Sequence, residues 1–142
     1  MHSDRMGKNI MIETLSRDGF APFGWILEHA EEDASAFQVV VEEPEPSGWR
    51  LAVSRVTARN VEKLARHPNT KESFTPVSGT VVFVVAAPDA PDEPRAFLLD
   101  RAVCIERNVW HASYALSHDA VVVISENLVV ESEDHALTDP IG

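Results

Sequence analysis

The chain has 142 residues, of which 44% are hydrophobic, and this size and composition suit one domain that folds alone. Asp and Glu number 23 against 12 Lys and Arg, which gives a formal net charge of −11. Such an acidic surface repels phosphate backbones and anionic lipids, so we expect no nucleic-acid or membrane partner, while a small-molecule substrate is compatible with it. The single cysteine, Cys104, excludes an internal disulfide and favours a reducing, cytoplasmic location.

Short β-branched segments separated by turn residues dominate the chain. Strands are expected, in order, at residues 37–43, 49–58, 59–67, 72–79, 80–88, 95–99, 102–107, 110–116, 120–126 and 128–133. The segment 80–88 is apolar on both faces and should lie centrally, and Phe74 and Val77 should anchor the strand before it. A short helical turn is the alternative to loop at 16–24, and a helix capped by Asn60 is the alternative to strand at 59–67.

The spacing of these strands is typical of an all-β sandwich or barrel with little helix. We expect residues 1–142 to form a single domain. Residues 1–10 should be flexible or partly vector-derived, and residues 131–142 should form an acidic, solvated or dimer-contacting tail.

The segment "ARHPNTKESFTPVSG", residues 65–79, places a histidine and a glutamate at H-x4-E spacing and a glycine at E-x6-G spacing. Pro68 restricts His67 to an extended conformation. If His67 and Glu72 point inward from neighbouring strands, their nitrogen and oxygen atoms suit a divalent metal ion. The alternative is a hydrogen-bonded edge histidine beside a surface glutamate.

A second candidate segment is "ERNVWHA", residues 106–112. Neighbouring residues of a strand face opposite sides, so an inward His111 implies an outward Trp110. An inward histidine alone is usually a satisfied core residue, but the first segment makes His111 a candidate partner of His67. Glu106 would face away from His111 unless a bulge or turn at "RN" brings both to one face.

These two segments carry a resemblance to a known family. "HPNTKESFTPVSG" resembles the later part of the first cupin motif, and His111 stands where the second motif has its histidine. "FAPFGWILE", "RHPNTKESFTPVSGTVVFVVAAP", "PRAFLLDRAVCIERNVWHA" and "AVVVISE" together resemble the ureidoglycolate lyase family of the cupin superfamily, from about Phe20 to about Glu126. The resemblance implies a cupin-like double-stranded β-helix, or jelly-roll barrel, a homodimer, and cleavage of ureidoglycolate to glyoxylate and urea in allantoin degradation, a branch of purine metabolism.

The chain departs from the family at several positions. Glu106 and Ala112 replace histidines of the family's "YHR" and "WHH" motifs, and "SENL" at 125–128 replaces "DRGG". Ala65 occupies the place of the first histidine of a full cupin metal motif. These departures leave a non-catalytic or degenerate cupin that binds a small molecule as the alternative to a lyase.

The candidate site follows from the residues that remain. Two imidazoles and a carboxylate can hold a divalent metal ion with positions open for water or substrate; the expected ligands are His67, Glu72 and His111. The expected catalytic residues are these three and Glu106. The expected substrate-binding residues are Arg66, Arg107 and Trp110, with surface arginines as the alternative for the first two. No organic cofactor is expected.

Overall fold

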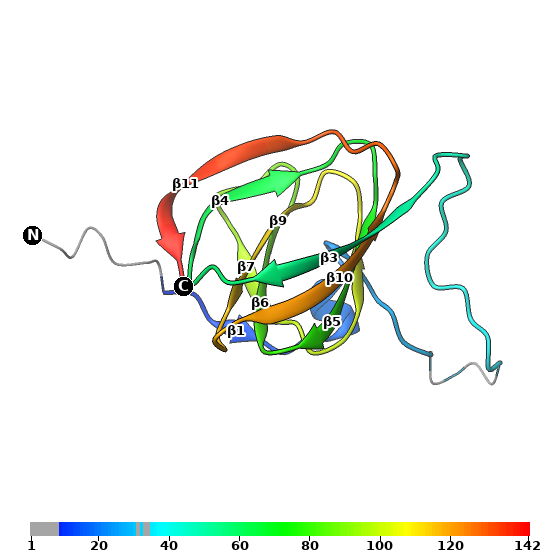
Figure 1. The fold of residues 1–142 in the computed structure, drawn as a ribbon, viewed down its shortest axis with the longest axis horizontal. Helices are drawn as coiled ribbons and strands as arrows, with labels where there is room; N and C mark the ends of the chain where they lie inside the picture. Colours follow the sequence, from blue (N-terminus) through cyan, green and yellow to red (C-terminus); the bar gives the residue numbers. More distant parts are fainter. Residues whose placement is uncertain (1–8, 31, 33–34) are drawn as a thin grey trace, which may run out of the picture.

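A computed structural model describes residues 9–30, 32 and 35–142, and these form two curled β-sheets that face each other as a barrel (Figure 1). The six-stranded sheet has the order β1 (Ile12–Glu13), β7 (Arg95–Leu98), β6 (Val81–Ala86), β9 (Trp110–Ala115), β4 (Val61–Arg66), β11 (Glu133–Ile141). The five-stranded sheet has the order β2 (Gly24–Ile26), β8 (Val103–Ile105), β5 (Glu72–Ser78), β10 (Ala120–Glu126), β3 (Arg50–Val56). The expected all-β jelly-roll barrel with little helix is confirmed.

Strand β6 is buried on both faces, as its unbroken apolar sequence predicts. Val81, Phe83 and Val85 face the space between the sheets and join the main hydrophobic cluster. The alternate residues Val82 and Val84 join a second cluster on the other face, together with Leu64, Trp110, Tyr114 and Ile141. The six-stranded sheet therefore packs on both sides, which fixes the strands that carry the candidate site.

The two ambiguous segments are resolved as one strand and one short helix. Segment 59–67 contains β4, which pairs with β9 and β11, so its good helix propensity is overridden by sheet pairing. Segment 16–24 contains α1 (Arg17–Phe20), whose first turn is capped by the Ser16 hydroxyl accepting from the Gly19 amide at 3.0 Å. No helix in the described residues is long and apolar enough to cross a membrane.

The prediction of a strand at residues 37–43 is wrong. These residues belong to a long irregular segment that extends outward from the barrel (cyan in Figure 1). No strand of the described chain pairs with them. Phe37 and Val39 are exposed rather than packed. Because β-branched residues favour strands only where a neighbouring strand and a packed face exist, their propensity has no effect here.

The end of the chain also differs from expectation. β11 begins only at Glu133, so residues 128–132 are not a strand, while most of the expected acidic tail is one. The side chain of Asn69 takes the place of a partner strand before β11: its amide donates to the Val129 carbonyl at 2.7 Å and accepts from the Glu131 amide at 2.9 Å. β11 then pairs with β4 over most of its length.

Two smaller expectations have mixed outcomes. Phe74 is buried in β5 as expected, but Val77, its expected companion, points outward and is 61% exposed. Of the start expected to be flexible, residues 1–8 lie outside the described residues, whereas Ile10 packs against the second hydrophobic cluster.

Candidate metal centre

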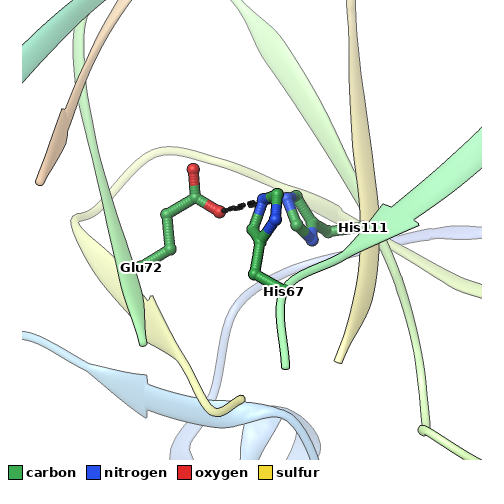
Figure 2. A group of neighbouring side chains, drawn as sticks. All are labelled: His67, Glu72 and His111. Atoms are coloured by element: carbon green, nitrogen blue, oxygen red, sulfur yellow. Dashed lines mark ion pairs between the residues drawn. The ribbon is translucent and has the colours of Figure 1, made fainter. Parts of the chain in front are cut away.

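Three side chains from different strands or strand ends meet between the two sheets. His67 follows directly after β4, Glu72 is the first residue of β5, and His111 lies in β9. Figure 2 shows the Glu72 carboxylate pointing toward both imidazole rings, which lie next to each other. The His67 carbonyl also accepts a hydrogen bond from the Asn108 amide at 3.1 Å, which joins the two loops that precede Glu72 and His111.

The three side chains offer one ligand atom each, and these atoms all lie within 4.8 Å of one another. Glu72 Oε1 is 3.2 Å from His67 Nε2 and 3.1 Å from His111 Nε2. Neither contact has hydrogen-bond geometry, and this buried oxygen has no hydrogen-bond partner among the described residues. A buried, unsatisfied carboxylate oxygen is costly, and a cation shared with the two nitrogens would satisfy it.

The other nitrogen of each imidazole is held by the backbone. His67 Nδ1 is 3.0 Å from the Glu131 carbonyl and 2.9 Å from the Ser132 hydroxyl, and His111 Nδ1 is 3.1 Å from the Val109 carbonyl. A carbonyl oxygen only accepts hydrogen bonds, so both Nδ1 atoms carry the proton, and in a neutral ring the Nε2 lone pair is left free. Such support of the far nitrogen is usual for metal-binding histidines. The residues therefore fit a divalent metal ion.

The electrostatics of the cluster favour an ionised carboxylate. Burial raises the pKa of Glu72, but the imidazoles of His111 and His67 outweigh burial and bring this pKa from its usual 4.5 to about 2. The Glu72 carboxylate in turn raises the pKa of His67, against the opposing effect of burial. Without a metal ion, an attraction therefore acts between Glu72 and His67 whenever His67 is protonated.

Two cavities reach this cluster, and Glu72 lines both. The larger, of about 820 Å3, lies under the irregular segment 37–48 and is also lined by Glu126. The smaller, of about 440 Å3, lies between the sheets; its lining includes His111, Phe74, Ser54, Lys63, Ala65 and Ser113. Both volumes are in the range of small-molecule sites, so the cluster is open to a substrate.

Arg66 and Trp110, two of the expected substrate-binding residues, lie away from the cluster. The Arg66 guanidinium stacks on the Trp110 ring at 4.4 Å and pairs with Glu133 at 2.9 Å. The Trp110 indole donates to the Pro88 carbonyl at 3.0 Å and packs in the second hydrophobic cluster. Because Trp110 and His111 are consecutive residues of β9, their side chains lie on opposite faces of the sheet. The contacts of Arg66 and Trp110 given above involve no residue of the cluster.

Glu106 and Arg107 are also not brought to the cluster. A turn does form at "RN", with Asn108 at a φ of 69°, but Glu106 remains exposed and accepts from the Arg107 amide at 2.9 Å. The Arg107 guanidinium contacts Glu43, which also pairs with Lys71 at 3.6 Å. Glu106 therefore does not join the expected catalytic set in this structure, and Arg107 is bound to an acidic partner.

One buried residue of the site, Glu126, is missed by the sequence reasoning. It lies at the end of β10 directly opposite Glu72 of β5, and its side chain is only 7% exposed. Burial raises the pKa of Glu126, and a hydrogen bond with the Glu72 carboxyl raises it further, against the effect of Arg50. The available signal was the departure "SENL" itself, but only strand register reveals that its glutamate faces Glu72.

Comparison with known proteins identifies the family. The family model of ureidoglycolate lyase matches residues 43–141, which is more than half of the chain and includes all three cluster residues. The chain belongs to the ureidoglycolate lyase family. The resemblance proposed from the sequence motifs is therefore confirmed.

Curated members of the family support the same assignment. A ureidoglycolate lyase of Agrobacterium fabrum is 30% identical over 86% of this chain and 83% of its own length. Ureidoglycolate lyase 1 of Rhizobium meliloti is 31% identical over 90% of this chain and 85% of its own length. The similarity thus extends over most of both chains and is not confined to one motif.

Solved structures of other proteins share the fold at low sequence identity. The capsular polysaccharide assembling protein CapF of Staphylococcus aureus has a TM-score of 0.54 at 19% identity, covering 65% of this chain. Procruciferin, an 11S globulin of Brassica napus, has a TM-score of 0.50 at 8% identity, covering 60% of this chain. This chain spans only 27% and 22% of those longer proteins, so the likeness concerns the fold alone.

Proposed function

We propose that this protein is a lyase that cleaves ureidoglycolate, or a closely related small carboxylated substrate, to glyoxylate and urea. The observation that carries the proposal is the convergence of His67, Glu72 and His111 within 4.8 Å between the sheets. The names of the curated relatives supply the substrate. Allantoin degradation, a part of purine metabolism, is the setting that we propose for this reaction.

The reaction has a simple balance of bonds and protons. The bond between the carbinol carbon and the urea nitrogen breaks, and its electron pair leaves with the nitrogen, which takes up a proton. The carbinol hydroxyl loses its proton and becomes the aldehyde oxygen of glyoxylate. A base beside the carbinol is therefore needed, and Glu72 is ionised throughout the neutral range because its pKa is about 2.

A divalent metal ion would be held by His67, Glu72 and His111, where it would polarise the carbinol oxygen. The two histidines present their Nε2 atoms to this position because their Nδ1 atoms are tied to carbonyl groups. Phe74 and Phe83 pack against the His111 ring at 5.6 and 6.3 Å and help to keep water from that side. The residues of the chain therefore orient the ligands before any ion binds.

The smaller cavity is the proposed substrate site. Alternation along the strands places Ser113 on the same face as His111, and Lys63 on the same face as Ala65, which is paired with His111. Among the described residues, Lys63 pairs only with the exposed Asp134 at 3.4 Å, which is a weak interaction. Lys63 can thus turn to a substrate carboxylate, a role that the sequence suggested for Arg66 and Arg107.

We also propose a cytoplasmic homodimer. The outer face of β3, β10 and β5 is apolar and exposed, with Leu51 at 63%, Val53 at 75% and Val77 at 61%. Contiguous exposed apolar residues of this kind are typical of a surface that binds another protein. The one cysteine, Cys104, is buried, and burial raises its pKa to about 11, so it is an unreactive thiol suited to a reducing compartment.

The direct test is urea release from ureidoglycolate by protein purified without chelator. His67→Ala and His111→Ala should each lower kcat/KM by at least about 100-fold, because each removes a ligand and a proton-handling group. His118→Ala is the matched control: it removes a histidine in the exposed turn between β9 and β10 and should leave turnover unchanged.

The possible results separate the two candidate functions. Turnover that depends on His67 and His111 supports the lyase. Metal binding without urea release from ureidoglycolate favours the non-catalytic cupin that binds a small molecule. Turnover that survives both substitutions contradicts the proposed site while leaving the family membership intact.

A further inference from the structure

A row of three charged residues crosses the inner face of the five-stranded sheet. Arg50 of β3, Glu126 of β10 and Glu72 of β5 are directly opposite one another in the strand register. Residues paired in this way lie on the same face with their Cβ atoms about 5 Å apart. The row therefore runs from the edge of the sheet to the candidate metal centre.

The three side chains are neighbours along the whole row. Arg50 Nη2 and Nε lie 2.6 and 2.9 Å from Glu126 Oε2, and Glu126 stands directly opposite Glu72 in the register of β10 and β5. The side chain of Glu126 is 7% exposed, whereas that of Arg50 is 48% exposed. The buried Glu126 side chain thus stands between an accessible guanidinium and the carboxylate that faces both imidazoles.

We propose that Glu126, anchored by Arg50, is a positioning residue that holds the Glu72 carboxyl with Oε1 directed at His67 and His111. The proposal rests on the proposed metal centre and deepens it. A glutamate side chain has three rotatable bonds, and Glu72 Oε1 has no hydrogen-bond partner among the described residues. The Glu126 side chain, directly opposite on the next strand, is placed to keep this oxygen in position. Outer contacts of this kind typically change metal affinity by about 10- to 100-fold.

The test uses two readouts on the full-length protein. The first is the nitrogen chemical shifts of the His67 and His111 rings in metal-free protein at one neutral pH, which report where the Glu72 carboxylate lies. The second is calorimetric titration of the metal-free protein with Zn2+. Glu126→Ala should change both ring spectra and weaken Zn2+ binding by at least about tenfold. Glu126→Gln keeps the length and a hydrogen-bond donor, so it should stay within about threefold of the wild type.

Two further variants guard against a general loss of structure. Arg50→Gln cuts the row at its exposed end and should give a smaller change in the same direction. Glu13→Ala removes another arginine–carboxylate pair, with Arg95 at 2.7 and 3.0 Å, far from the row in the sheet order, and should change neither readout. Ring shifts and Zn2+ affinity in Glu126→Ala that equal those of the wild type would overturn the positioning role. A wild type that binds no Zn2+ but shows the expected shift changes would instead contradict the metal centre alone.

Discussion

Glu72 is the residue on which the site depends, because one of its carboxylate oxygens lies within 3.2 Å of both imidazoles. Its position at the start of β5 brings it between the two sheets, where burial alone would favour the neutral acid. The histidines reverse that preference, so the Glu72 carboxylate is ionised. Its attraction to the imidazoles can stabilise the fold of the metal-free protein.

This attraction has a defined pH dependence in metal-free protein. The pKa of Glu72 is lowered from 4.5 to about 2, so its stabilising contribution is full above pH 4.5 and is lost as the pH falls toward 2. The pKa of His67 is raised above 6.5, so its contribution is full below pH 6.5 and is lost as the pH rises through the raised value. The contribution should therefore be largest between pH 4.5 and pH 6.5.

The measurement is the free energy of urea unfolding of the wild type and of Glu72→Gln, with chelator present, at about pH 3, 5.5 and 9. The two proteins should differ most near pH 5.5, by roughly 1–3 kcal/mol, and less at both extremes. A difference that is the same at all three values would show that Glu72 is not paired with His67 in solution.

The turn between β5 and β6 is tightly constrained at Gly79, the glycine of the H-x4-E-x6-G pattern. Its φ is +77°, and a Cβ atom there would lie 2.4 Å from the Asp119 carbonyl oxygen and 2.7 Å from Ala120 Cβ. The turn thereby sets where β5 ends and where β6 begins. Any side chain at this position has to push β10 away from β5, the strand pair that carries Glu126 and Glu72.

Gly79→Ala should therefore destabilise the fold by roughly 3 kcal/mol, from left-handed backbone strain plus the steric overlap. The matched control is Gly48→Ala, at a φ of +65°, where the added atom meets only the Leu128 side chain, at 3.2 Å or more. Gly48→Ala should cost about 1 kcal/mol. Equal unfolding free energies for the two variants would contradict this account of the turn.

Strands could be predicted from the sequence wherever an alternating or apolar segment has a neighbouring strand to pair with in the sheet. The segment 80–88 was placed correctly because both of its faces are packed, and 59–67 because its two sheet partners exist. Segments 37–43 and 128–132 have a similar composition but no partner strand among the described residues, and no property of their own residues reveals this. Propensity describes a segment, whereas pairing depends on the rest of the chain.

The same distinction applies to the site. His67, Glu72 and His111 were found because their motif spacings resemble those of a known family. Glu126 and Arg50 were not found, because their relation to Glu72 exists only in the strand register. Arg66 can bind a carboxylate by bidentate contacts, but its side chain packs against Trp110 on the opposite face.

The barrel as a whole presents an unusual surface for an acidic protein. The outer face of β3, β10 and β5 carries several exposed apolar side chains, and Trp49, just before β3, is 68% exposed. A homodimer that covers this face would bury these side chains and leave the two cavities in each subunit. Charge repulsion between two chains of net charge −11 has to be offset by that apolar contact.

Val53→Glu should therefore shift the protein from dimer to monomer in sedimentation-velocity experiments, because it places a new charge on the exposed apolar face. Leu116→Glu is the control, since this residue is exposed in the turn after β9 and lies outside that face. A Val53→Glu protein that stays dimeric, or a wild type that is monomeric at micromolar concentration, would contradict this interface.

The central claim is that His67, Glu72 and His111 bind a divalent metal ion. The most direct measurement is the metal content of protein purified without chelator, determined by mass spectrometry alongside the protein concentration. The account predicts about one divalent ion per chain in the wild type and in His118→Ala, and less than about a tenth of an ion per chain in His67→Ala and His111→Ala. A wild type without metal that still releases urea from ureidoglycolate, or a metal content unaffected by both substitutions, would contradict it.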